Sequence, residues 1–270
     1  MTLLRRLISG AVLAALVVAA ALAGGPAFLG VSALALLVGL EEFRRLGARM
    51  GCEPAWWLMG PLAGLLLLRG VIPGGSALEV GIGLALLPGL PLLLLRSHRE
   101  RPFVAFAMGV AGAVWLGDGL GFLVLLRRAP LPHSEAGGVV LAVLAVAVVS
   151  DTAAYLVGST VGRHPFFPSI SPHKTVEGAV AGLAAAVVLM AVVLPGLRPQ
   201  VPLAAAIGCG LLAGAASQAG DLVESQLKRS AGVKDAGGWI PGHGGLLDRL
   251  DSVVLVGPVV YSILRVLHAL

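Results

Sequence analysis

Charged residues are scarce in this sequence. They make up 12% of its 270 residues, whereas about a quarter is usual for soluble domains. Aromatic residues are also few, at 5%, while hydrophobic residues make up 57%. Apolar stretches of roughly 20 residues, the length that a helix needs to cross a bilayer, recur along the chain and leave no room for a soluble domain. The composition therefore excludes an ordinary soluble enzyme and predicts an all-α, polytopic membrane protein.

Cysteine is almost absent. The two cysteines, Cys52 and Cys209, are far apart in the sequence and belong to no CxxC or Cys/His pattern. This excludes a disulfide framework and a zinc site. The net charge of +5 comes from basic residues in short loops between apolar runs, rather than from a basic soluble face. We therefore expect no nucleic-acid partner.

Nine apolar runs are candidate transmembrane helices. They are 7–23, 26–40, 55–69, 78–95, 103–126, 138–160, 177–194, 202–220 and 250–268. The first run follows Arg5 and Arg6 and resembles a secretory signal, but it is long for a signal core, so we expect it to remain as a span. We divide the chain into an N-terminal membrane region, 1–140, and a C-terminal catalytic region, 141–270. Glycines spaced four apart, such as Gly178 and Gly182, predict close helix packing.

The distribution of basic residues predicts the orientation in the membrane. With a cytoplasmic N-terminus, fourteen of the 19 Lys and Arg residues lie on the cytoplasmic side of the nine spans. Because cytoplasmic loops hold the excess of positive charge, we expect this orientation, in a bacterial inner membrane. It places two long loops, 161–176 and 221–249, in the cytoplasm.

The second of these loops has the composition of an active site. Charged and polar residues crowd the 31 positions from 221 to 251: Asp221, Glu224, Ser225, Lys228, Arg229, Lys234, Asp235, His243, Asp248, Arg249 and Asp251. If the preceding helix continues past Gly220, the first four of these share one helix face. Asp248, Asp251 and Ser252 form a second oxygen-rich group at the head of the last helix.

A glycine-rich turn, PGHGG at 241–245, is able to bring these two groups together. Facing carboxylates repel one another unless a proton or a cation intervenes, and hard oxygen ligands suit Mg²⁺ that also holds substrate phosphates. Lys and Arg nearby suit phosphate oxygens. These residue types predict metal-dependent phosphoryl or nucleotidyl transfer. The alternative is a solvated charged hairpin without catalytic function.

Two further features point to the same site. Asp151 lies inside an apolar run, where a carboxylate is costly and is a candidate for function, or for helix packing through a neighbouring hydroxyl. The following loop contains Ser171, Lys174 and Thr175 among rigid prolines, which suits a phosphate-binding lip or a simple cationic anchor. Asp118, between two glycines of another run, fits a functional or a structural role equally well.

Ordered motifs in the C-terminal half closely resemble the phosphatidate cytidylyltransferase signature. They are SQLKR at 225–229, KD at 234–235, PGHGG at 241–245 and LDRLD at 247–251, with GDLVE at 220–224, DTAAY at 151–155 and SPHKTVEG at 171–178 upstream. Residues 1–140 are similar only in being apolar and multi-spanning. His173 departs from the pattern, which usually has lysine there, and this puts phosphate affinity at that position in doubt.

The resemblance implies an all-helical membrane enzyme that converts CTP and phosphatidic acid to CDP-diacylglycerol and pyrophosphate. It also implies Mg²⁺, a monovalent cation such as K⁺ beside it, and a homodimer. By position in the motifs, Asp221, Asp248 and Asp251 resemble the carboxylates around the metal centre, with Ser225 nearby.

Other residues receive substrate roles as hypotheses. We expect Lys228 to act in catalysis and to contact phosphate. The remaining substrate-binding candidates are Asp151, Ser171, Lys174, Thr175, Arg229, Lys234 and His243, although His243 also suits a purely structural role in its turn. Two alternatives remain open: a CTP-dependent kinase of polyprenol-type alcohols, and an ion-coupled transporter that uses Asp118 and Asp151.

Overall fold

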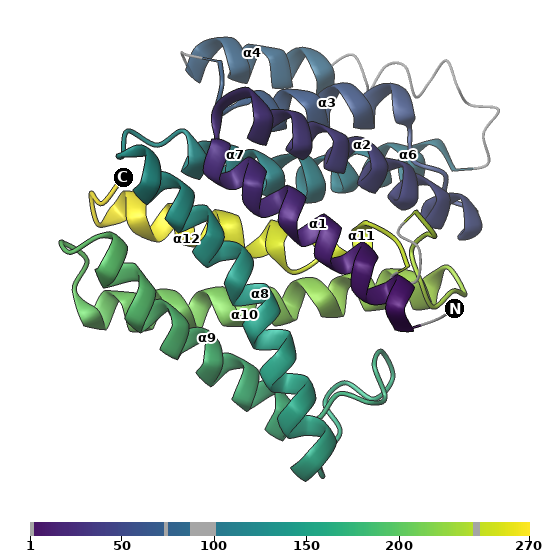
Figure 1. Ribbon diagram of the computed structural model, residues 1–270. Coiled ribbons are helices and arrows are strands. Elements are labelled where there is room, and N and C mark those ends of the chain that lie inside the picture. Colours follow the sequence, from purple (N-terminus) through teal and green to yellow (C-terminus); the bar gives the residue numbers. More distant parts are fainter. Residues whose placement is uncertain (1–2, 73–74, 87–100, 240–243) are drawn as a thin grey trace.

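The computed structural model describes residues 3–72, 75–86, 101–239 and 244–270, and Figure 1 shows their arrangement. The helices are α1 (Leu3–Ala23), α2 (Gly25–Arg49), α3 (Trp56–Leu68), α4 (Gly75–Leu86), α6 (Pro102–Gly112), η1 (Ala113–Asp118), α7 (Gly119–Arg127), α8 (His133–Val161), α9 (Val176–Leu197), α10 (Leu203–Ser230), α11 (Leu247–Leu250) and α12 (Val253–Val266). Over these ranges the chain forms no named strand. The prediction of an all-α fold is confirmed.

Five helices of the described ranges are long and apolar enough to cross a membrane. They are α2, the continuous helix Pro102–Arg127 that joins α6, η1 and α7, then α8, α9 and α10. The apolar helices Ile8–Ala23 and Trp56–Leu68 are shorter, and the predicted run 78–95 extends outside the described residues. The chain is thus a polytopic membrane protein, while the count of nine spans stays a prediction.

Small residues let the C-terminal helices approach closely. A Cβ added at Gly182 of α9 would lie 2.7 Å from the carbonyl oxygen of Ser150 on α8. One added at Gly210 of α10 would lie 2.6 Å from Val187 Cα on α9. In lipid, helix association depends on such van der Waals contact because the surrounding tails are as apolar as the side chains. The glycine spacing predicted this packing correctly.

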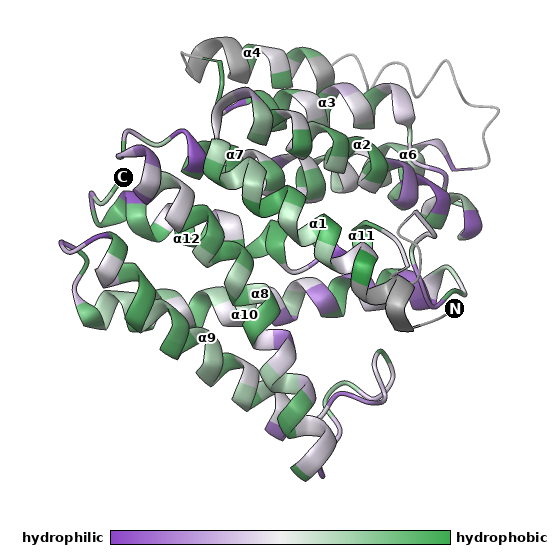
Figure 2. Cartoon of the chain, viewed as in Figure 1, coloured by the Kyte–Doolittle hydropathy of each residue, from purple (hydrophilic) through white to green (hydrophobic). Residues whose placement is uncertain are grey.

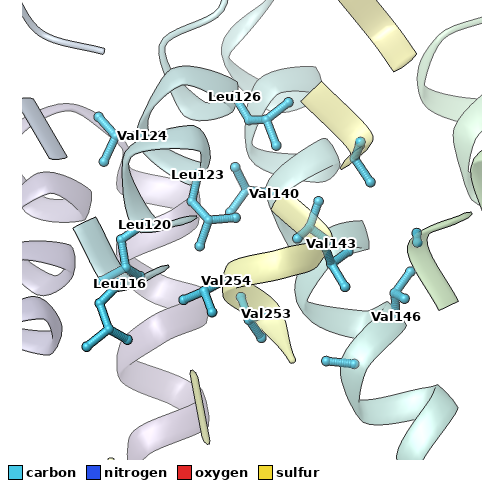
Figure 3. Packing of buried hydrophobic residues seen from close by; sticks show 14 of the residues in the cluster. Leu116, Leu120, Leu123, Val124, Leu126, Val140, Val143, Val146, Val253 and Val254 are labelled. Carbon is cyan, nitrogen blue, oxygen red and sulfur yellow. The ribbon is translucent and has the colours of Figure 1, made fainter. Parts of the chain in front are cut away.

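The centre of the molecule is filled by branched aliphatic side chains. Figure 3 shows Leu116, Leu120 and Leu123 of η1 and α7, Val143 of α8 and Val254 of α12 as parts of one buried cluster. Leu116, Val143 and Val254 have no exposed surface. This core holds the last helix against the middle of the bundle, and so fixes where the segment before α12 can lie.

Hydrophilic residues lie mainly toward the ends of the helices. Figure 2 shows them at the C-terminal ends of α2 and α10 and around α11, the same end at which Figure 1 marks the N-terminus. The C-terminus lies at the opposite end. The candidate site is built at this hydrophilic end.

Candidate active site

The first part of the site joins α10 to the loop before α9. Helix α10 continues past Gly220 to Ser230, so the loop expected at 221–249 begins as helix and Asp221 projects from a rigid element. The Asp221 carboxylate pairs with the ammonium group of Lys174 and accepts a hydrogen bond of 3.4 Å from Ser225 Oγ. Lys174 precedes α9, and its pairing with Asp221 brings together two motifs that are 47 residues apart.

A second cluster lies one turn further along α10. Lys228 Nζ lies 2.6 Å from Asp248 Oδ1 and also forms an ion pair with Glu224, whose side chain has no exposed surface. The other Asp248 oxygen accepts hydrogen bonds from the backbone N–H groups of Ala236, at 3.1 Å, and Gly245, at 2.7 Å. The predicted helix face and the LDRLD motif therefore meet in space.

Asp248 is held in its ionised form. Burial by itself would raise the pKa of this carboxyl group, but the hydrogen bonds from Lys228 and from the Gly245 N–H, together with the positive charge of Lys228, outweigh burial and lower the pKa. At neutral pH Asp248 is therefore an anion that binds Lys228 and holds Ala236 and Gly245 close to α10.

Asp251 reaches the first cluster because Gly220 has no side chain. A Cβ at Gly220 would overlap the carbonyl oxygen of Asp251 and lie 3.1 Å from Ser252 Cα. Asp251 is 7% exposed, and its Oδ1 accepts a hydrogen bond of 2.7 Å from the backbone N–H of Ser252. The charges of Asp221 and Asp151 act on it. Three carboxylates, from α8, α10 and the junction of α11 and α12, thus lie close enough for their charges to interact.

A cavity of about 580 Å³ opens beside Asp151 and Asp221, and we call it the polar cavity because charged side chains are among those that line it. Asp151 and Tyr155 line it from α8, Lys174 and His173 from the loop before α9, and Asp221 from α10. Ligand pockets usually have volumes of roughly 300–1,000 Å³, so the cavity suits a nucleotide or a lipid headgroup. Asp151 faces this cavity, as a functional role requires.

The remaining predicted site residues differ in their positions. Thr175 lines the cavity, but it also caps α9 by accepting a hydrogen bond of 3.2 Å from Gly178 N–H. Ser171 ends a backbone turn, and its backbone carbonyl oxygen accepts a hydrogen bond of 3.2 Å from the Lys174 N–H. Arg229 donates to the Ile170 carbonyl at 3.3 Å, which ties α10 to this loop.

Two predicted residues cannot be assigned to either cluster. Lys234 is exposed in the turn after α10. His243 lies outside the described residues, so its role stays a prediction.

Sequence reasoning missed Glu42. This residue of α2 has no exposed surface, and its carboxylate accepts hydrogen bonds from the backbone N–H groups of Leu246, at 3.1 Å, and Leu247, at 2.7 Å. Gly237 and Gly245 lie directly against its oxygens. Glu42 therefore anchors the start of α11, and with it Asp248, to the N-terminal half. Because Glu42 follows an apolar run within the charged segment EEFRR, its local sequence resembles a solvated helix end.

Asp118 has a structural partner. It forms an ion pair with Arg69 at the end of α3, and the Arg69 guanidinium carbon lies 4.3 Å above the ring centre of Phe122. Asp118 lies in the π-helical segment η1. This arrangement favours the structural interpretation of Asp118 that the sequence left open.

The first cluster contains donor atoms of the type that a hard divalent cation prefers. The charges of Asp151 and Asp221 act on Asp251, and Ser225 adds a hydroxyl beside Asp221; oxygen donors are what Mg²⁺ prefers. Among the residues that the structure describes, however, no three His, Cys, Asp or Glu side chains already form a group that would hold a metal ion. Asp248 is instead bonded to Lys228 and two backbone amides.

Comparison with known protein families gives a match over almost the whole chain. A family model described as "Cytidylyltransferase family" matches residues 4–267, almost the whole chain. The chain belongs to the cytidylyltransferase family. This match includes the N-terminal half, in which no motif of the family was recognised from the sequence.

Curated relatives of this cytidylyltransferase-family chain match shorter regions. A Staphylococcus saprophyticus protein named phosphatidate cytidylyltransferase is 38% identical over 146 residues, which cover 54% of this chain and 55% of that protein. The Arabidopsis thaliana protein named phosphatidate cytidylyltransferase 5, chloroplastic, is 47% identical over 118 residues, 44% of this chain and 29% of that protein. An uncharacterised Escherichia coli protein, YnbB, is 35% identical over 61% of this chain and 62% of its own length. The chain thus spans between 29% and 62% of these relatives.

Proposed function

We propose that this protein transfers a cytidylyl group from CTP to phosphatidic acid, giving CDP-diacylglycerol and pyrophosphate in phospholipid biosynthesis. The family membership and the names of the relatives support a cytidylyltransferase acting on phosphatidate. The observation that carries the proposal is the pairing of Lys174 with Asp221 in a polar cavity at the end of long apolar helices. There a water-soluble nucleotide and a lipid headgroup are able to meet.

The proposed reaction is an in-line displacement at phosphorus. A phosphate oxygen of phosphatidic acid forms a bond to the α-phosphorus of CTP, the bond between that phosphorus and the oxygen bridging to the β-phosphate breaks, and pyrophosphate leaves. The attacking phosphate is already anionic, so little proton transfer is needed and positioning and charge stabilisation dominate. Lys174 binds phosphate within the cavity, and Lys228, Arg229 and Lys234 supply further positive charge at the end of α10.

A divalent cation belongs to the proposal. Asp221, Asp251 and Ser225 would hold Mg²⁺, and when bound it would neutralise charge on the triphosphate. Lys228 holds Asp248, and Asp248 holds the segment that contains Asp251 against α10. A role for Asp248 as a metal ligand remains part of the hypothesis. A monovalent cation such as K⁺ beside the metal is the final element of this site.

The position of the label in CTP tests the reaction. With purified protein, phosphatidic acid and Mg²⁺, we expect label from α-³²P-CTP in the lipid fraction and none from γ-³²P-CTP. A kinase of polyprenol-type alcohols would give the opposite pattern with an alcohol acceptor, because it transfers only the γ-phosphate. Absence of α-label in lipid from a folded preparation would refute the proposed transfer.

The proposed setting is a bacterial inner membrane, with the N-terminus and the active site in the cytoplasm and the protein as a homodimer. The excess of basic residues on that side supports this orientation. A cysteine introduced at exposed Lys234 should react with an impermeant thiol reagent only in inverted vesicles. Chemical cross-linking in native membranes tests the dimer.

A further inference from the structure

A second, apolar cavity lies nearer the N-terminal end of α8. Its volume is about 610 Å³, and α1, α2, α7, α8, α11 and α12 line it. The lining runs from Gly10 to Val18 along α1 and from Leu141 to Val149 along α8. At a helical rise of 1.5 Å per residue, each stretch is about 12 Å long. The cavity is therefore elongated along the helices.

Along α8, the lining of the polar cavity begins two residues after the lining of the apolar cavity ends. On α8, Val148 and Val149 line the apolar cavity, and Asp151, less than one turn later, lines the polar one. Arg249 of α11 also lines the apolar cavity, and it lies close enough to Asp151 for their charges to interact. A cation thus stands at the junction of an apolar space and a polar space. This combination fits an anionic group that is attached to a hydrocarbon chain.

The apolar cavity also opens sideways. Three of its lining side chains have large exposed fractions: Leu16 at 49%, Leu34 at 60% and Val148 at 66%. In a membrane this surface faces the hydrocarbon tails. A lipid is therefore able to enter from the bilayer without its tail crossing water.

We propose that the apolar cavity holds one acyl chain of the phosphatidate substrate, with the phosphate at the Arg249 and Asp151 junction. The identity of the lipid rests on the proposed function, whereas the site itself rests on the two cavities. The lining of about 12 Å approaches half of a hydrocarbon core of about 30 Å, so the chain spans most of one leaflet. The headgroup then lies beside Lys174 and Asp221, where CTP is proposed to react.

Narrowing the cavity tests this assignment. Ala35 on α2 and Ala145 on α8 line the cavity and have little side-chain volume. We expect Ala35→Phe and Ala145→Phe to raise the KM for dioleoyl phosphatidic acid about ten-fold, while the KM for dihexanoyl phosphatidic acid and for CTP stays unchanged. The matched control is Ala184→Phe, which places the same side chain on an exposed position of α9 away from the cavity. Equal effects on both lipids, or the same effect in the control, would overturn the proposal.

A binding experiment on the unmodified protein keeps the test independent of turnover and of variant folding. Phosphatidic acid with a photoreactive diazirine at the end of one acyl chain should label peptides of α1, α2 and α8, and excess unlabelled phosphatidic acid should reduce this labelling. Labelling confined to the outer face of α9, or labelling that competing phosphatidic acid leaves unchanged, would assign the cavity to bulk lipid and refute the proposal. Labelling of the cavity in a protein without transferase activity would refute the proposed function and leave the lipid site standing.

Discussion

Glu42 and Leu247 lie 205 positions apart in the sequence, yet the buried Glu42 carboxylate accepts a hydrogen bond of 2.7 Å from the Leu247 backbone N–H. This bond and its partner from Leu246 join the N-terminal half to the segment that carries Asp248 and Asp251. The N-terminal helices therefore do more than cross the membrane: they hold the last turn of the active site in place. We regard Glu42 as a positioning residue.

Loss of the Glu42 carboxylate should disturb the site from a distance. In Glu42→Ala, two buried N–H groups lose their acceptor, each at a cost of about 1–3 kcal/mol. Glu42→Gln keeps one acceptor oxygen but turns an NH₂ group toward the other donor. We expect the kcat of Glu42→Gln to fall with little change in the KM for CTP, and Glu42→Ala to melt at a clearly lower temperature.

The neighbour Glu41 is the matched control for Glu42. Its carboxylate pairs with Arg44 and Arg45 in a partly exposed position, and such pairs contribute about 0–1 kcal/mol. Glu41→Gln should therefore retain both activity and melting temperature. If Glu42→Gln behaves like Glu41→Gln, the positioning role is wrong.

The absence of a side chain at Gly220 should be essential. Gly220→Ala would push a methyl group into the backbone at Asp251 and separate α10 from the junction before α12. We expect a loss of transferase activity with the protein still inserted in the membrane. Gly208→Ala on the same helix meets no atom within 4 Å and should retain activity, because alanine favours a helix. Wild-type activity of Gly220→Ala would show that this close contact is dispensable.

Lys228 should stabilise the protein because its ammonium group pairs with two carboxyl groups, those of Glu224 and Asp248. Without it, the Asp248 anion would lose its cation beside buried Glu224, and breaking a buried ion pair costs about 3–5 kcal/mol. We therefore expect Lys228→Met to lower the melting temperature strongly, and a second change, Glu224→Gln, to restore part of the loss. A thermal melt of wild type, both single variants and the double variant measures this coupling. Additive effects would contradict it.

Asp221 should be required for turnover rather than for folding. We expect Asp221→Asn to reduce activity to near background, because it removes the anion that pairs with Lys174 and is proposed to hold the metal, while membrane insertion and the melting profile stay close to wild type. Asp118→Asn provides the contrast, since Asp118 pairs with Arg69 away from the cavity: it should lower the melting temperature and leave the KM values unchanged. A near wild-type rate in Asp221→Asn would remove it from the metal site.

The sequence was informative where physical constraints are local. Apolar length and glycine spacing predicted helices and their close contacts, and the spacing of Asp221, Ser225 and Lys228 predicted a shared helix face because each depends only on helix geometry. The glycine-rich turn predicted that the two acidic groups would meet, and Lys228 does lie 2.6 Å from Asp248.

Other features depend on tertiary contact and have no local signal. Glu42 looks like part of a charged helix end until its distant N–H partners are known, and the Arg69 partner of Asp118 lies 49 positions away. Thr175 has the residue type of a phosphate ligand, yet it also caps α9. The apolar cavity was not foreseen because its lining residues have the same composition as any lipid-facing surface.

The most direct test of the central claim is cytidylyl transfer by purified protein in liposomes that contain phosphatidic acid. Supplied with α-³²P-CTP and Mg²⁺, the protein should place label in CDP-diacylglycerol, and the label should disappear when phosphatidic acid is omitted or when EDTA is added. A folded, inserted preparation that gives no labelled lipid would contradict the assignment of this site to cytidylyl transfer, and label that persists in EDTA would contradict its dependence on a divalent cation.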